Sequence, residues 1–193
     1  MTEITDTMVL AAQRGDQAAC RAIVEALHRP VIATIFRFLG TGYRREVEDL
    51  AQEVFLKVFR AIGTFDRKRA KFTTWVYTFV RNHCYDVLKR RRIPTTSLHA
   101  VGEDQAPREL PDRRELRPEQ DAENAELGRR IGEALASLGE DQRMVFVLRE
   151  YEDLDYSEIA QITGVNEGTV KSRLFRAKEA LRQHLAPYLK AGA

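Results

Sequence analysis

The sequence predicts an all-α protein with two helical domains joined by a flexible linker. Apolar residues recur at helical spacing on both sides of residues 94–122, and no segment alternates convincingly between apolar and polar residues. Residues 94–122 themselves hold four of the six prolines and show no helical period. We therefore expect an N-terminal domain over residues 1–93, a linker over residues 94–122 and a C-terminal domain over residues 123–193.

Helix signals follow one another within each domain. Asp16 is a good N-cap, and the apolar period that follows it runs to the glycines at positions 40 and 42. Further helices are expected over residues 46–62 and 72–92. In the C-terminal domain, helical spacing runs from Ile131 to Tyr151, and helices are expected over residues 156–163 and 167–185. The apolar residues of the first helix are Ile23, Leu27, Val31, Ile35 and Leu39.

The composition is typical of a folded chain and excludes several classes of protein. Of the 193 residues, 44% are apolar and 31% are charged, which argues against disorder. No apolar stretch approaches the roughly 18 residues of a membrane span, and no basic apolar leader opens the chain. Cys20 and Cys84 are too few for a disulfide framework, so we expect a cytoplasmic protein without membrane insertion.

Charge is distributed unevenly, although the formal net charge of the whole chain is only +2. Residues 1–93 carry +7 (17 basic, 10 acidic) and residues 159–193 carry +4 (6 basic, 2 acidic). Residues 94–122 carry −3 (4 basic, 7 acidic) and residues 123–158 carry −6 (4 basic, 10 acidic). Two basic zones around an acidic middle indicate two contacts with anionic partners, or, in the plainer interpretation, solvated surfaces.

The helix predicted over residues 46–62 has two unlike faces. One is broadly apolar, whereas Leu56 falls on the opposite face among polar residues. An exposed apolar residue ringed by charge suits a protein interface, but a lone exposed leucine is also common, so periodicity leaves both interpretations open. The candidate interface residues are Asp49, Gln52, Glu53 and Leu56.

The segment 65–72 and the helix predicted after it combine cations with aromatic residues. Four cations lie between Phe65 and Phe72, and the helix ends in three consecutive arginines. Interleaved basic and aromatic residues favour single-stranded nucleic acid, because every base has a face that can stack. The alternative is a cationic helix end that satisfies the helix dipole. The outer face of that helix is expected to expose Thr74, Thr78, Arg81, Asn82, Tyr85 and Lys89, with Trp75 at the edge of its apolar face. The candidate contacts are these seven residues together with Arg67, Lys68, Arg69 and Lys71.

Residues 155–178 predict a DNA-binding helix-turn-helix. Asp155 and Glu158 have the spacing of a capping box, Gly164 fits a left-handed turn, and Asn166 can cap the second helix. On that helix, Val170 and its helical neighbours form an apolar face, and a basic face with an exposed phenylalanine lies opposite. A solvated basic helix packed on its neighbours is the alternative. The candidate DNA contacts are Thr169, Lys171, Ser172, Arg173, Phe175, Arg176 and Lys178, of which Arg173 and Lys178 lie at the flanks and are expected to contact phosphates.

No constellation of catalytic residues is visible. The sequence has no phosphate-binding glycine loop, no nucleophile elbow and no metalloprotease helix motif. His83 and Cys84 are adjacent, so on a helix their side chains diverge by about 100°, which is poor geometry for one metal ion. We expect no enzyme, no cofactor and no metal.

Three segments in order, residues 49–59, residues 72–77 with Asn82, and residues 156–178, resemble motifs of one family. The chain resembles a bacterial RNA polymerase sigma factor of the extracytoplasmic-function (ECF) group of the sigma-70 family, over roughly residues 8–93 and 123–186. The resemblance implies a domain two that binds core polymerase and recognises and melts the minus-ten element. It also implies a domain four, a winged-helix-like helix-turn-helix that reads the minus-thirty-five element.

The resemblance also implies partners. The face around Leu56 would meet the clamp helices of the largest polymerase subunit, and the C-terminal domain would dock on the flap of the second-largest subunit. The loop of residues 66–71 would capture a base flipped from the minus-ten element of promoter DNA. An anti-sigma factor would hold the protein inactive. Lys171 stands where the family often has arginine, which makes bidentate reading of guanine less expected there.

Two rival functions fit the sequence less well. A free helix-turn-helix repressor or activator would bind a palindromic duplex as a dimer, but no coiled-coil or other dimer signal is evident, and no homo-oligomer is expected. A nucleic-acid-processing enzyme would need catalytic residues that the sequence does not offer. The sequence therefore favours a promoter-specificity subunit.

Overall fold

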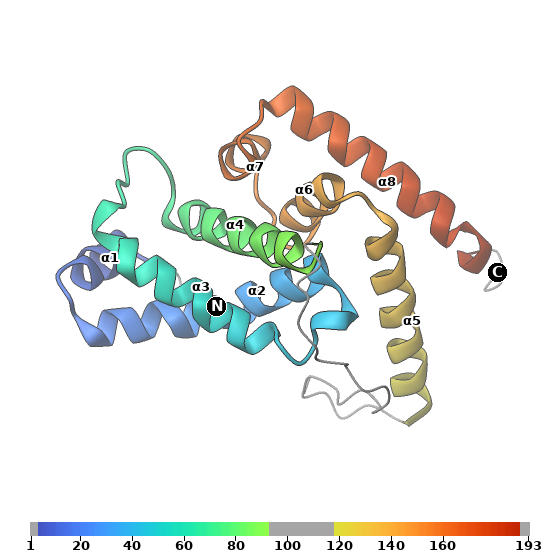
Figure 1. Ribbon diagram of the computed structural model, residues 1–193, viewed down its shortest axis with the longest axis horizontal. Coiled ribbons are helices and arrows are strands. Elements are labelled where there is room, and N and C mark those ends of the chain that lie inside the picture. Colours follow the sequence, from blue (N-terminus) through green and yellow to red (C-terminus); the bar gives the residue numbers. More distant parts are fainter. Residues whose placement is uncertain (1–3, 93–117, 190–193) are drawn as a thin grey trace.

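A computed structural model describes residues 4–92 and 118–189, and of residues 118–125 and 189 it describes the backbone only. The described residues form helices and turns without strands (Figure 1). The all-α prediction is confirmed. The segment 93–117, which holds most of the predicted flexible linker, lies outside the described residues.

The N-terminal bundle consists of helices α1 to α4. These are α1 (Asp6–Gln13), α2 (Gln17–Leu39), α3 (Val47–Ala61) and α4 (Phe72–Arg92), with short 3-10 turns η1 (Thr41–Tyr43) and η2 (Ile62–Thr64). Asp16 caps α2 as predicted, because its carboxylate accepts hydrogen bonds from the backbone N–H groups of Ala18 and Ala19. The apolar period predicted for α2 is confirmed, since all five of its residues are buried.

Helix α1 is a feature that the sequence reasoning missed. Gln13, at its end, donates hydrogen bonds to the carbonyls of Ile62 (2.9 Å) and Phe65 (3.0 Å). Arg67 also pairs with Asp6 of this helix at 3.2 Å. Helix α1 therefore fixes the base of the basic loop that joins α3 to α4.

The C-terminal bundle consists of helices α5 to α8. These are α5 (Pro118–Ser137), α6 (Glu140–Glu150), α7 (Tyr156–Thr163) and α8 (Glu167–Leu189). Helix α5 begins inside the segment for which no helical period was expected, with a proline at its first turn, where the missing N–H costs nothing. Gly139 separates α5 from α6, so the helical spacing seen from Ile131 to Tyr151 belongs to two helices. The domain boundaries at residues 93 and 123 stay predictions.

The two bundles pack directly against each other and share one buried core. In Figure 1, α6 and α7 lie against α2 and α4, and α8 runs along the outside. One continuous apolar cluster includes Phe38 and Val80 of the N-terminal bundle and Met144, Leu148 and Ile159 of the C-terminal bundle, all with no exposed surface. A smaller cluster joins α5 to α8. The sequence reasoning did not predict this contact between the bundles.

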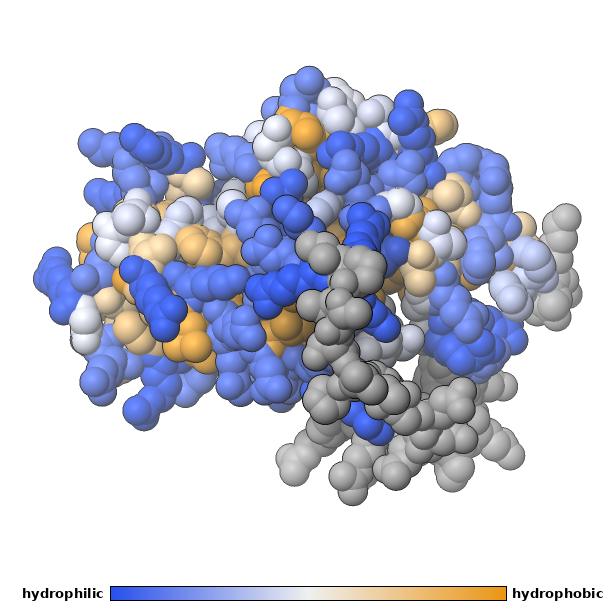
Figure 2. All heavy atoms as spheres, viewed as in Figure 1, coloured by the Kyte–Doolittle hydropathy of each residue, from blue (hydrophilic) through white to orange (hydrophobic). Residues whose placement is uncertain are grey.

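The surface is mainly hydrophilic on the face shown in Figure 2, with hydrophobic areas over the helices of the N-terminal bundle. Among the described residues, no helix combines the length and the apolar character that crossing a bilayer requires.

Candidate nucleic-acid interface

The predicted helix-turn-helix is present as α7, a left-handed turn and α8. Asp155 accepts a hydrogen bond from the backbone N–H of Glu158, and the Glu158 carboxylate accepts one from the backbone N–H of Asp155. The hydrogen bonds that the Asp155 carboxylate accepts hold its pKa below the ordinary value. Gly164 adopts a positive φ of 71°, and Asn166 caps the start of α8 through the N–H of Thr169. The capping and turn predictions are confirmed.

The outward face of α8 carries the predicted reading residues. Phe175 is 71% exposed, as its place on the outward face predicts, and Lys171, Ser172 and Arg176 are also exposed. On the opposite side, Val170 has no exposed surface and packs into the core. The exposed set can offer a guanidinium, an ammonium, a hydroxyl and an aromatic ring to a major groove.

The flanking cations of α8 are engaged in ion pairs. Arg173 binds Asp141 at 2.5 Å, and Lys178 binds Glu150 at 2.8 Å. Thr169 is half-buried, and its hydroxyl donates to the side chain of Asn166. The residues expected to hold phosphates are thus partly neutralised by carboxylates of the same bundle.

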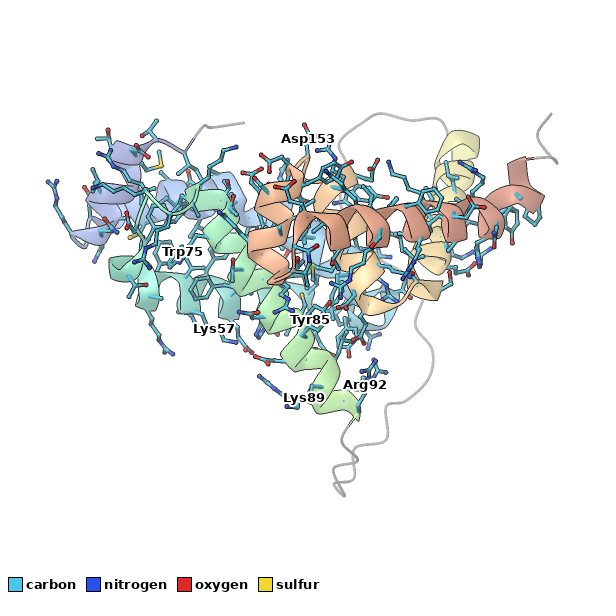
Figure 3. The ribbon with its side chains drawn as sticks, turned by 90° about the horizontal axis from the view of Figure 1, so that it is seen from above. Lys57, Trp75, Tyr85, Lys89, Arg92 and Asp153 are labelled. Carbon is cyan, nitrogen blue, oxygen red and sulfur yellow. The ribbon has the colours of Figure 1, made fainter. Side chains whose placement is uncertain are left out.

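Helix α4 carries an aromatic cluster at its start. The Trp75 ring lies 4.7 Å from Phe79, 5.4 Å from Phe65 and 5.7 Å from Phe72, measured between ring centroids. Trp75 is half-buried, as its predicted place at the edge of the apolar face requires. Figure 3 shows Trp75, Tyr85, Lys89 and Arg92 spaced along this one helix.

The basic loop before α4 is exposed. Asp66 orders it by accepting the backbone N–H of Lys68 at 2.9 Å, and it pairs with the Arg69 guanidinium at 3.6 Å. The Arg69 side chain is 87% exposed. Farther along, Asn82 and Lys89 are exposed, whereas Thr78 and Arg81 are half-buried, with the Arg81 guanidinium 4.7 Å from the Tyr85 ring centre.

The C-terminal bundle covers part of the α4 face that the sequence predicted to be exposed. Thr74 is only 1% exposed, because its hydroxyl donates to the Glu158 carboxylate at 3.0 Å. Lys71 pairs with the same carboxylate at 3.1 Å, which raises the pKa of the lysine. Tyr85 is half-buried and donates to Asp141 at 2.7 Å. The expected exposure of Thr74 is therefore wrong for this arrangement of the bundles.

The α3 surface has the two faces that periodicity predicted. Val54, Val58 and their helical neighbours are buried, whereas Leu56 is 57% exposed. Asp49, Gln52 and Glu53 are exposed around it. These four residues form one continuous polar and apolar patch, here called the α3 patch.

His83 lies just behind the α3 patch and is buried, with 1% exposed surface. Lys57 Nζ donates to His83 Nδ1 at 2.7 Å, so the imidazole proton is assigned to Nε2, which faces Glu53 Oε2 at 3.6 Å. Burial, and secondarily the Lys57 charge, lower the pKa of His83. Cys84 is fully buried, and burial raises the pKa of its thiol, so it is not a reactive cysteine.

Acid is expected to destabilise the fold through His83. In the unfolded chain His83 has the ordinary histidine pKa of ~6.5, whereas in the folded protein it binds a proton only at lower pH. This contribution to the free energy of unfolding is therefore present above pH ~6.5. It is lost as the pH falls from there through the lowered pKa of the folded state. Urea unfolding at pH 8 and at pH 5.5 should show a smaller loss for His83→Gln than for the parent chain. The exposed His184, changed to glutamine, is the control, and an unaltered loss in His83→Gln would contradict the assignment.

Three comparisons place this geometry among known proteins. The family models "Sigma-70 region 2" and "Sigma-70, region 4" match residues 23–93 and 128–181. The chain is 33% identical over 191 residues to the ECF RNA polymerase sigma-E factor of Escherichia coli strain K12, covering 97% of this chain and 98% of that protein. It is 34% identical over 194 residues to the RNA polymerase sigma-H factor of Pseudomonas aeruginosa, covering 95% and 94%.

Solved structures share the fold. CnrH, in complex with the cytosolic domain of CnrY, matches with a TM-score of 0.69 and 20% identity over 99% of this chain and all of that one. The sigma factor RpoE of Bartonella quintana, in complex with the anti-sigma factor NepR, matches with a TM-score of 0.63 and 21% identity over 86% and 96%. At these identities the likeness establishes the fold.

Proposed function

Because the chain belongs to the ECF group of the sigma-70 family of RNA polymerase sigma factors, we propose that its two bundles divide promoter recognition between them. As a member of this family it is a transcription initiation factor that directs RNA polymerase to promoters, and not an enzyme. Its place of action is then the cytoplasm, where the polymerase works. The observation that supports the proposal is that one chain has two chemically distinct exposed basic surfaces, one on the capped helix-turn-helix and one beside the aromatic rings of α4.

The C-terminal bundle reads the minus-thirty-five element as duplex. Support comes from the exposure of Phe175, Lys171 and Arg176 on the outer face of a capped α8. Arg173 and Lys178 are better placed for phosphates than for bases, because both lie at the edges of that face. The same bundle docks on the flap of the second-largest polymerase subunit.

The N-terminal bundle holds the minus-ten element as an unwound strand. Support comes from the exposed cationic loop before α4 and from aromatic rings beside it. The exposed cations of the loop attract the backbone, and a base flipped out of the duplex is captured beside them. Capture offsets the cost of unstacking, so the open strand is favoured without any bond being broken.

The α3 patch binds the clamp helices of the largest polymerase subunit. An exposed leucine surrounded by two carboxylates and an amide suits a partner with an apolar pocket and a basic rim. An anti-sigma factor is the proposed regulator, since the sigma factor RpoE of Bartonella quintana was solved with the anti-sigma factor NepR. No homo-oligomer is expected.

Transcription with purified components tests the proposal. The chain is combined with core RNA polymerase, bound promoters are selected from genomic fragments, and run-off transcripts are mapped from the selected DNA. We expect transcripts from a defined start site that depend on adding the chain. Absence of a specific transcript with a core enzyme that is active with another sigma factor would refute the proposal.

A further inference from the structure

The basic loop of residues 66–71 starts at a point that two different kinds of contact hold in place. Gln13, the last residue of α1, donates from its side-chain amide to the backbone carbonyls of Ile62 at 2.9 Å and Phe65 at 3.0 Å. The Phe65 ring meets the ring of Phe72 edge-on, with 5.1 Å between the ring centroids. The backbone at Phe65 is therefore held by α1, and its side chain is held by the start of α4.

Beyond Phe65 the loop is exposed and does not pack closely on α1. Residues 66–69 are all exposed. A cavity of about 210 Å³ separates the loop from α1, with Leu10 and Gln13 on one side and Phe65 and Arg67 on the other. Close-packed parts of a protein have few voids larger than a water molecule, so apolar packing does not fix the loop against α1. The position of the loop relative to α1 depends instead on polar contacts across this cavity.

Gln13 makes the stronger of the polar contacts between α1 and the loop. The ion pair of Asp6 and Arg67 also joins them at 3.2 Å, but the two side chains are 67% and 62% exposed. Exposed ion pairs contribute little, because salt screens them and both side chains lose conformational freedom. The Gln13 side chain is half-buried, and its amide nitrogen has two N–H groups, one for each of the two carbonyls.

A loop that captures a flipped base must hold one conformation if it is to distinguish one base from another. Hydrogen-bond donors and acceptors discriminate between bases only where they are fixed in direction, and a mobile loop averages over several directions. The loop cations Arg67, Lys68 and Arg69 attract phosphates in any conformation, because that attraction carries no sequence information. Fixing the start of the loop therefore affects specificity much more than affinity.

We propose that Gln13 is a positioning residue for reading the minus-ten element. Through the carbonyls of Ile62 and Phe65 it holds the basic loop in the conformation that discriminates between captured bases. The inference rests on the proposed function, since it takes this loop as the site of base capture. Gln13 acts through the two carbonyls and need not touch DNA itself. Helix α1 thereby contributes to promoter recognition, although it carries none of the residues proposed to contact DNA.

Base preferences at single promoter positions test this role in the complete holoenzyme. The full chain is combined with core polymerase, and run-off transcript is measured from promoters that carry each of the four bases at each position of both elements. The variant Gln13→Met keeps an unbranched side chain of similar length and removes both donors. The variant Gln13→Lys retains donors, because an ammonium group has three N–H groups for the same two carbonyls. Gln17→Met, at the exposed first residue of α2, is the control.

Gln13→Met is expected to lower the preference for the best base at one position of the minus-ten element by at least about fivefold. Transcript from the promoter with the best base should fall, whereas promoters with the other three bases should keep their level, because the loop cations still hold phosphates. Preferences throughout the minus-thirty-five element should stay as in the parent chain. Gln13→Lys and Gln17→Met should retain the parent's preference, since a change of net charge affects all promoters alike and cancels in the ratio.

Three results would overturn the inference and leave the proposed function intact. They are a loss of transcript by the same factor from every promoter, as a general loss of folded protein would cause, an unchanged preference in Gln13→Met, and equal losses of preference in Gln13→Met and Gln13→Lys. In each of these cases the parent chain still selects bases in both elements. A parent chain without any base preference in the minus-ten element would instead overturn the proposed function.

Discussion

Replacing Leu56 by aspartate is expected to abolish association with core RNA polymerase while leaving the fold intact. The side chain is 57% exposed at the centre of the α3 patch, so the fold does not depend on it. At the centre of an interface, however, a new carboxylate would be desolvated without a partner. Truncation of such central residues already costs about 2 kcal/mol or more, and a buried unpaired charge adds to that loss.

Leu127→Asp is the matched control, because Leu127 is 55% exposed and also lies on a helix, outside the α3 patch. Association is measured as the binding of each variant to surface-immobilised core polymerase, and helicity is measured by circular dichroism. Leu127→Asp should associate like the parent chain. Unchanged association of Leu56→Asp, with helicity retained, would refute the α3 patch as the polymerase contact.

Replacing Arg176 by alanine is expected to relax promoter specificity at one base position. Arg176 is exposed on the outer face of α8, where its guanidinium can donate two hydrogen bonds to the major-groove edge of a guanine. Loss of a bidentate base contact costs about 1–3 kcal/mol at that position and little elsewhere. Competition between promoter duplexes that differ at single positions measures this directly with the reconstituted holoenzyme.

Arg182→Ala is the control for a general effect of charge. Arg182 is 75% exposed farther along α8 and pairs with Glu179 at 3.2 Å. Its replacement should therefore weaken duplex binding only a little, and by the same factor for every promoter sequence. If Arg176→Ala instead weakened the binding of all duplexes by the same factor, Arg176 would be a phosphate contact and not a base contact.

The features that depend on a few consecutive residues were predictable from the sequence. The Asp16 cap, the capping box of Asp155 and Glu158, and the turn at Gly164 each follow from the chemistry of neighbouring side chains and backbone. The spacing of apolar residues also predicted which face of α3 and of α8 is buried and which is exposed, because burial in a helical bundle follows the 3.6-residue repeat.

The contact between the bundles was not predictable in the same way. Glu158 was expected to cap α7, which it does, but its second role depends on Lys71 and Thr74, which precede it by more than eighty residues. The spacing of polar residues identifies a polar face of a helix. It does not show whether that face is covered by solvent or by polar side chains of another bundle. Thr74 was therefore expected to be exposed and is buried.

Helix α1 was missed for a related reason. Its eight residues are too few for an apolar period to stand out, and no capping box marks its start as one marks α7, which has the same length. Gln13 has no motif that would mark it, yet its amide donates to two backbone carbonyls that hold the basic loop. Such side-chain to backbone contacts become visible only with the tertiary fold.

Footprinting of one reconstituted holoenzyme on one selected promoter tests the central claim most directly. If the chain holds duplex with its C-terminal bundle and an unwound strand with its N-terminal bundle, DNase should reveal a protected duplex upstream. Permanganate should then modify unpaired thymines downstream, near the transcription start. Protection of a single palindromic duplex by the chain without polymerase, with no permanganate-reactive thymines when polymerase is added, would contradict the account.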